Sequence, residues 1–207
     1  MPLRPDRSTA LRERFEAPGS SVRDVNRRTP FLVLIVLAVV AVVVAAWFHR
    51  RGNEAGGGEE VSVVQRVIDG DTLVVANGDR VRLVQIDAPE ISQGECYAVE
   101  AMRALDMLAP AGSRVRLEGD PALDDVDRFG RRLRYVWRNG VNVNLALVRK
   151  GAASVWFFDG SRGLHADTLL TVARNAERSS IGLWGACPAA RLDPFRGVDT
   201  GRKPFQK

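Results

Sequence analysis

Cysteine and histidine are scarce in this chain of 207 residues, and their scarcity excludes several classes of metalloprotein. The two cysteines, Cys96 and Cys187, are too few for a disulfide-dense mini-scaffold, a four-cysteine zinc site or an iron–sulfur cluster held by this chain alone. The two histidines, His49 and His165, form no HExxH motif and no histidine-rich site. A catalytic metal of this chain would therefore have to be held by oxygen atoms.

The central part of the chain also lacks an excess of charge of either sign. Residues 61–188 contain 16 basic and 16 acidic residues, whereas residues 1–60 contain 9 and 7, and residues 189–207 contain 5 and 2. The net charge of +5 therefore lies in the end segments. Recognition of an anion by the central part requires individually placed arginines, because no broad positive field is available there.

A segment without charge is the clearest feature of the N-terminal part. Residues 31–48 carry no charged or polar side chain, and at a rise of about 1.5 Å per residue they can just cross a bilayer core of about 30 Å. We predict a single transmembrane helix here, with a cleaved signal peptide as the alternative because small residues at 44–46 would suit cleavage. More arginines precede the segment than follow it, which predicts a cytoplasmic N-terminus and an extracytoplasmic domain.

The rest of the chain divides into segments of different composition. Residues 1–30 are polar and predict a flexible tail, and the glycine-rich residues 49–60 predict a linker. Residues 61–188 carry the pattern of one α+β domain. Residues 189–207 show no periodicity and predict a loose basic tail.

Apolar alternation and turn residues predict five short strands and three helices within the domain. The strands are expected at Val61–Ile68, Leu73–Ala76, Val81–Ile86, Ser113–Glu118 and Leu133–Trp137, and the helices at Tyr97–Leu108, Asn142–Lys150 and Leu164–Ser179. Short strands with helices after the third and the fifth are typical of a five-stranded β-barrel of the OB type.

Acidic residues stand at the ends of these predicted strands. Asp71 belongs to an Asp-Gly-Asp turn between the first two strands, and Asp87 follows the third strand, three residues before Glu90. Each motif alone is an ordinary turn, but together they supply the oxygen ligands that a hard cation such as Ca²⁺ prefers. Strand alternation alone would place Arg82 and Asp87 on opposite faces, because they are an odd number of residues apart.

Two arginines accompany these acids. Arg82 lies in the third predicted strand, and Arg131 lies in a charged turn before the fifth. A guanidinium can bind a phosphate through two hydrogen bonds. Hydrolysis of a phosphodiester requires a base for the water, a cation, and fixed donors where negative charge develops. The acids and arginines together therefore indicate phosphoryl chemistry.

The region from about residue 63 to residue 184 resembles the staphylococcal nuclease (thermonuclease) family. The matching motifs are VIDGDTL at 67–73, RLVQIDAPE at 82–90, DRFGR at 127–131, NLALVRKGAA at 144–153 and GLWG at 182–185. The resemblance implies an OB barrel with three helices and a nuclease that cuts DNA and RNA to leave 3′-phosphate ends. It also implies that Asp71, Asp87 and the backbone carbonyl of Ala88 bind Ca²⁺.

The same resemblance implies catalytic roles for three further side chains. Glu90 would be the general base, and Arg82 and Arg131 would bind the phosphate and stabilise the transition state. The family places tyrosines at its nucleotide pocket, whereas the corresponding stretch here carries no phenols. Trp156 and Phe157 are candidates for stacking on a base, with core packing as the alternative.

Cys96 and Cys187 are candidates for a disulfide if the domain lies in an oxidising compartment, and two unpaired thiols are the alternative. The leading hypothesis is a monomeric, membrane-tethered, calcium-dependent nuclease outside the cytoplasm, with nucleic acid as its substrate. A non-catalytic OB barrel that binds nucleic acid or protein is the alternative from another class. The presence of every expected acid argues against that alternative.

Overall fold

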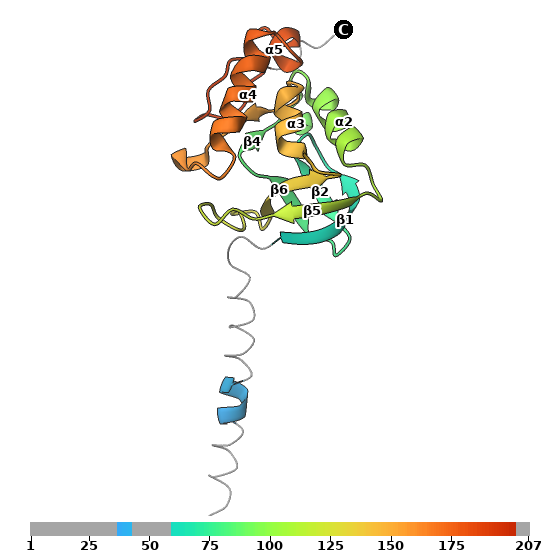
Figure 1. Ribbon diagram of the computed structural model, residues 1–207, viewed down its shortest axis with the longest axis vertical. Helices are drawn as coiled ribbons and strands as arrows, with labels where there is room; N and C mark the ends of the chain where they lie inside the picture. Colours follow the sequence, from blue (N-terminus) through green and yellow to red (C-terminus); the bar gives the residue numbers. More distant parts are fainter. Residues whose placement is uncertain (1–36, 43–58, 202–207) are drawn as a thin grey trace, which may run out of the picture. The chain divides into compact units, whose positions relative to one another are not determined.

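The computed structural model describes residues 37–42 and 59–201 of the chain, and Figure 1 draws it as a ribbon. Residues 37–42 are helical. Among the helices of these two ranges, none combines the length and the apolar sequence needed to cross a bilayer. The predicted tail at 1–30, most of the predicted anchor at 31–48 and the predicted linker as far as residue 58 lie outside the described residues.

Five strands close into a barrel, as the sequence predicts. Their bounds are β1 Glu59–Val67, β2 Thr72–Val75, β3 Arg80–Leu83, β5 Arg114–Glu118 and β6 Arg132–Arg138. β1 pairs antiparallel with both β2 and β5, β2 pairs with β3, and β5 pairs with β6. A parallel pairing of β3 with β6 completes the ring. The short β7, Val141–Asn142, extends β6 through a hairpin.

Alternating side chains explain why these segments form a barrel with an apolar interior. In β5, Val115 and Leu117 are buried, whereas the residues between and beside them reach the surface. β2 is buried along its whole length. Alternation removes one face of β5 from water, β2 is buried on both faces, and the barrel closes around these buried side chains.

Helices gather at one side of the barrel (Figure 1). They are α2 Ala98–Leu108, α3 Val143–Arg149, α4 Ala166–Arg178 and the short α5 Leu183–Ala186, with the 3₁₀ turns η1 Ile91–Gln93 and η2 Phe158–Gly160. The Asn142 side chain caps α3 by accepting a hydrogen bond from the Leu145 N–H. The buried Asn144 side chain joins α3 to the barrel, since it donates to the carbonyl of Val84 and accepts from the N–H of Val136.

The third predicted strand is interrupted, and this interruption shapes the site. β3 ends at Leu83, and a separate strand β4, Ile86–Asp87, pairs with β8, Ser154–Val155. Gln85 between them has a φ of 62°, which is the left-handed region. Its buried side chain donates to the carbonyl of Ser161 and accepts from the N–H of Gly163. These distant partners hold the chain in the reversal after β3.

The prediction of a loose tail from residue 189 onward is wrong for residues 189–201. Ala190 and Thr200 are buried against the domain. A disulfide joins Cys96 to Cys187 just before this segment, and the Cys96 N–H donates to the carbonyl of Gly201 near its end. The segment is ordered by contacts with residues about 100 positions earlier, which a search for local periodicity does not detect.

Candidate active site

Arg82 lies at the centre of the candidate site and is 6% exposed. Its Nη1 donates to the carbonyls of Leu83 and Ile86 at 2.9 Å and 2.7 Å. Its Nη2 lies 2.8 Å from Asp87 Oδ1 and 3.0 Å from Asp71 Oδ2. The break in the strand at Gln85 lets Arg82 and Asp87 meet despite their odd spacing, so the structure brings together three of the predicted site residues.

Asp71 is held at both carboxylate oxygens and is only 2% exposed. Besides the contact with Arg82, Oδ2 accepts the Ala88 N–H at 2.7 Å, and Oδ1 accepts the Thr72 hydroxyl at 3.1 Å. Burial raises the pKa of Asp71 well above the ordinary range of an aspartate, and the nearby charges of Asp69 and Asp87 act in the same direction. The attraction of Arg82 opposes this rise in pKa only in part.

Glu90 is partly buried at the residue before η1, where its backbone N–H donates to Glu95 Oε2 at 2.7 Å. Burial raises the pKa of the Glu90 carboxyl, and the charges of Asp69 and Asp87 raise it further against the attraction of Arg82. Glu90 therefore belongs electrostatically to the same cluster as the two aspartates. A carboxylate with increased proton affinity is suited to accept a proton from water.

Arg131 reaches the cluster from the turn before β6. Gly130 has a φ of 74° in this turn, a conformation that glycine adopts without strain. Asp127 organises the turn, since Oδ1 accepts the backbone N–H of Arg131 and Oδ2 lies 2.7 Å from its Nε. The Arg131 Nη1 lies 3.4 Å from the Thr72 hydroxyl, which itself donates to Asp71. Arg131 is thus linked to the acidic cluster through one side chain.

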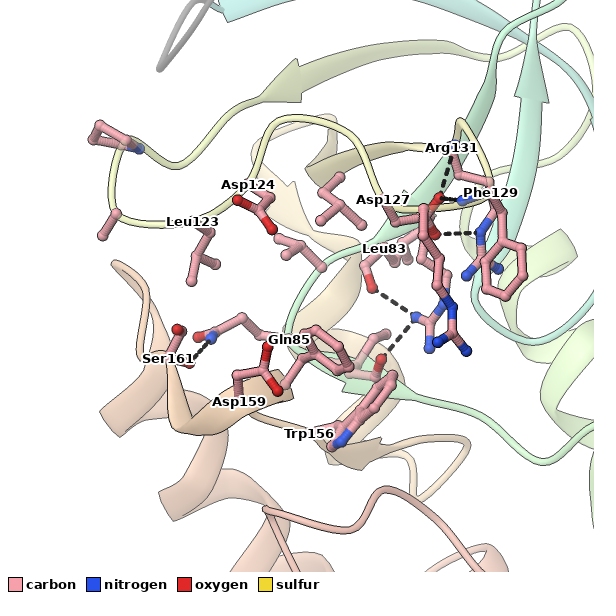
Figure 2. Close-up of a pocket in the computed structure, with 18 residues that line it drawn as sticks. Leu83, Gln85, Leu123, Asp124, Asp127, Phe129, Arg131, Trp156, Asp159 and Ser161 are labelled. Atoms are coloured by element: carbon pink, nitrogen blue, oxygen red, sulfur yellow. Dashed lines mark hydrogen bonds and ion pairs between the residues drawn. The ribbon is translucent and has the colours of Figure 1, made fainter.

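A pocket of about 540 Å³ opens beside Arg82 and Arg131. Figure 2 shows Phe129 and Arg131 at one side of the pocket and Trp156 and Asp159 at another. The rings of Trp156 and Phe158 meet edge to face, with centroids 5.5 Å apart. The pocket therefore combines guanidinium groups with aromatic faces.

The prediction of Phe157 as a pocket residue is wrong, because its side chain is fully buried in the core. Alternation continues after β8, so that Trp156 and Phe158 face the pocket and Phe157 faces inward. Sequence reasoning missed Phe158 and also Phe129, which are 56% and 58% exposed. The signals were available: the two-residue period identifies Phe158, and Phe129 lies inside the DRFGR motif.

The described residues contain no group of three or more His, Cys, Asp and Glu side chains arranged to hold a metal ion. Asp71 and Asp87 nevertheless meet at the same nitrogen of Arg82, and their carboxylates, like the carbonyl of Ala88, are hard oxygen donors of the kind that Ca²⁺ binds together with water. The charge of the cluster also fits a cation, because four carboxylates surround a single guanidinium. The Arg82 guanidinium faces Asp71 and Asp87 directly. The carboxylates that raise its pKa are those of Asp69, Asp71, Asp87 and Glu90. Burial is the main cause of the raised pKa of Asp71, and repulsion by the charges of Asp69 and Asp87 adds to it.

Comparison with known proteins identifies the family. A profile described as staphylococcal nuclease homologue matches residues 80–186, more than half of the chain, and the chain belongs to this family. A thermonuclease of Staphylococcus intermedius is 28% identical over 131 residues, covering 60% of this chain and 76% of that protein. Protein ParB of Escherichia coli is 37% identical over 153 residues, covering 68% and 81%. An uncharacterized endonuclease of Escherichia coli O157:H7 is 37% identical over 127 residues, covering 58% and 74%.

Proposed function

We propose that this protein is a calcium-dependent nuclease that hydrolyses phosphodiester bonds of DNA and of RNA. The observation that carries the proposal is the placement of Arg82 between Asp71 and Asp87, with Glu90 in the same electrostatic cluster. Membership of the staphylococcal nuclease homologue family supports it, as do relatives named as nucleases.

The roles of the side chains follow from their chemistry. Glu90 takes a proton from water, whose oxygen bonds to phosphorus while the bond from phosphorus to the 5′ oxygen breaks. The 5′ oxygen leaves, takes up a proton from solvent and becomes a hydroxyl, and the other product keeps a 3′-phosphate. Arg82 and Arg131 offset the negative charge that grows on the phosphoryl oxygens. A bound Ca²⁺ would polarise the phosphate and favour ionisation of water, and Asp71, Asp87 and the Ala88 carbonyl would hold it.

The surrounding contacts hold the side chains of Arg82 and Arg131 in fixed orientations before substrate binds. The carbonyls of Leu83 and Ile86 fix one nitrogen of Arg82 and leave its orientation little freedom. Asp127 holds Arg131 through Nε, and the Nη1 of Arg131 lies 3.4 Å from the Thr72 hydroxyl. Donors that are already oriented lower the cost of reorganisation in the transition state.

The pocket is suited to hold a nucleotide base without discriminating between the different bases. Trp156 and Phe158 offer aromatic rings, and stacking on such rings tolerates any base. The guanidinium groups of Arg128 and Arg131 already lie over the Phe129 ring. The phenol groups that the family uses are missing at the Trp156–Phe158 stretch. We therefore propose broad substrate acceptance with little preference for one base.

We also propose that residues 31–48 anchor the protein in a membrane and that the nuclease domain faces outside the cytoplasm. The uncharged sequence of this segment supports the anchor. The disulfide between Cys96 and Cys187 supports an oxidising compartment, because disulfides persist there. Protease protection of the domain in intact cells, compared with permeabilised cells, tests the location.

The decisive experiment incubates the detergent-purified full chain with plasmid DNA across a titration of Ca²⁺, with and without EGTA. We expect cleavage that requires Ca²⁺ and yields 3′-phosphate ends, and loss of cleavage in Glu90→Gln. Binding of DNA without cleavage would instead identify a non-catalytic binding module. Full activity in Glu90→Gln would refute the assignment of Glu90 as the base.

A further inference from the structure

The C-terminal segment, defined as residues 188–201, touches the site directly. The Val198 N–H donates to Asp87 Oδ2 at 2.8 Å, although 111 residues separate them. The other oxygen of the same carboxylate accepts from Arg82 at 2.8 Å. Asp87 is therefore clamped between a side chain of the barrel and the backbone of the C-terminal segment.

Gly197 shows how closely the C-terminal segment passes the carboxylate. It is buried and has a φ of 77°. A Cβ at this position would lie 2.8 Å from Asp87 Oδ2 and 3.8 Å from Cδ1 of Trp156. The approach to Asp87 is too close for a Cβ, the distance to Trp156 is an ordinary van der Waals contact, and the positive φ also favours glycine.

The C-terminal segment is fastened at several points, so its course past Asp87 is fixed. The disulfide between Cys96 and Cys187 ties its start to the residues before α2. Cys96 also accepts the Thr200 hydroxyl at its carbonyl and donates its N–H to the carbonyl of Gly201, both at 2.9 Å. Midway, the carbonyl of Pro194 accepts the N–H of Phe157 at 2.7 Å. A loose tail would need none of these contacts.

We propose that the C-terminal segment is a positioning element of the active site, in which the Val198 N–H and the bare backbone of Gly197 set the orientation of the Asp87 carboxylate. This inference rests on the proposed function. Groups that orient a metal-binding carboxylate typically change metal affinity by about 10–100-fold when they are lost. The C-terminal segment thus acts through Asp87 and needs no contact with substrate.

Two glycine variants of the full chain test this proposal. Gly197→Ala inserts a methyl group against Asp87, whereas Gly201→Ala places one 3.1 Å from the methyl group of Ala189 and within 4 Å of nothing else. Both glycines have positive φ, 77° and 67°, and both lie in the C-terminal segment. The pair therefore shares the backbone strain and differs in the contact with Asp87.

The measurements are the Kd for Ca²⁺ by calorimetry, kcat and KM on plasmid DNA, and the thermal midpoint. We expect Gly197→Ala to raise the Kd for Ca²⁺ at least about tenfold over Gly201→Ala and to lower kcat more than it raises KM, with similar thermal midpoints. Equal Kd and kcat in the two variants of an active enzyme would overturn this inference and leave the proposed function intact. A wild-type chain that cleaves nothing would overturn both.

A second measurement does not depend on metal or on the folding of the glycine variants. Hydrogen exchange reports the Val198 amide in the wild-type chain and in Asp87→Ala. We expect the exchange of this amide to accelerate at least about tenfold when its acceptor is removed, since a hydrogen bond to a charged group is among the stronger ones. Unchanged protection of the Val198 amide would show that its hydrogen bond to Asp87 does not form in solution.

Discussion

Gly70 lies between the two aspartates Asp69 and Asp71 in the chain, and substituting it should destabilise the domain by overpacking. A Cβ on Gly70 would stand 2.6 Å from the Cβ of Ala88 and 2.8 Å from the Cβ of Ala101 in α2. Both separations are about 1 Å inside the optimum of roughly 3.5–4.0 Å between carbon atoms. The φ of Gly70 is not in the left-handed region, so the backbone itself accepts alanine and the expected effect is steric.

The expected loss of stability follows from the atoms that the new methyl group would have to displace. Overpacking of a core typically costs about 1–3 kcal/mol, and we expect Gly70→Ala to lie near the upper end because both opposing methyl groups sit directly on backbone. Ala101→Gly removes one of these methyl groups and alone costs about 1 kcal/mol in the interior of a helix. The double variant should be more stable than the sum of the two losses predicts, by about 1 kcal/mol or more.

Urea denaturation of the wild type, the two single variants and the double variant measures this coupling. The m-value checks that the unfolding remains two-state. Gly78→Ala is the control, because a Cβ there meets nothing within 4 Å and only the positive φ of 87° is strained. Its loss of stability should add to that of Ala101→Gly. A Gly70→Ala variant as stable as wild type, or one whose loss simply adds to that of Ala101→Gly, would refute the steric argument.

Three other predictions concern the general base, the two neighbouring arginines and the disulfide. Glu90→Gln should lower kcat by about 10²–10⁴-fold with an unchanged thermal midpoint, and it should remove the acid limb of the pH–rate profile. Because the pKa of Glu90 is raised, the wild-type rate should fall on acidification at a higher pH than an ordinary glutamate would give. Arg131→Ala should lower kcat by about 10²–10³-fold. Arg132→Ala should leave kcat unchanged, since its guanidinium pairs with two partly exposed carboxylates and lines no part of the pocket; equal losses in the two arginine variants would contradict the assignment. Replacing Cys96 and Cys187 with alanine should cost about 2–4 kcal/mol in urea denaturation, and a stability equal to the oxidised wild type would show that the disulfide contributes nothing.

The barrel could be predicted from the sequence because the pattern of apolar residues that specifies each strand lies within that strand. In β5 the alternation of Val115 and Leu117 with charged residues determines which face is buried, and no distant contact is needed to see it. The helix α2 begins and ends within one residue of its predicted bounds for the same reason, since its buried alanines and leucine recur at helical spacing. Local patterns of this kind suffice to place the acids at strand ends.

The convergence of the acids on Arg82 could not be predicted from local patterns. Gln85 resembles an ordinary polar residue of a strand, and its positive φ depends on partners at Ser161 and Gly163, more than 70 positions later. The contact of Val198 with Asp87 depends on a backbone N–H, which has no signature in the sequence. The residue types suggested a shared site and the family resemblance implied the role of each member, but neither indicated a contact with the C-terminal segment.

The charge of the site distinguishes an enzyme from a binding module. Two aspartates face one guanidinium, and burial raises the pKa of Asp71 because the attraction of Arg82 offsets only part of the cost of desolvation. A protein that only held nucleic acid would gain nothing from these carboxylates, because they repel the phosphate that Arg82 and Arg131 attract. The arrangement becomes favourable when a cation is needed beside the phosphate and a base beside the water. The two carboxylates beside Arg82 are therefore better explained by hydrolysis of nucleic acid than by binding alone.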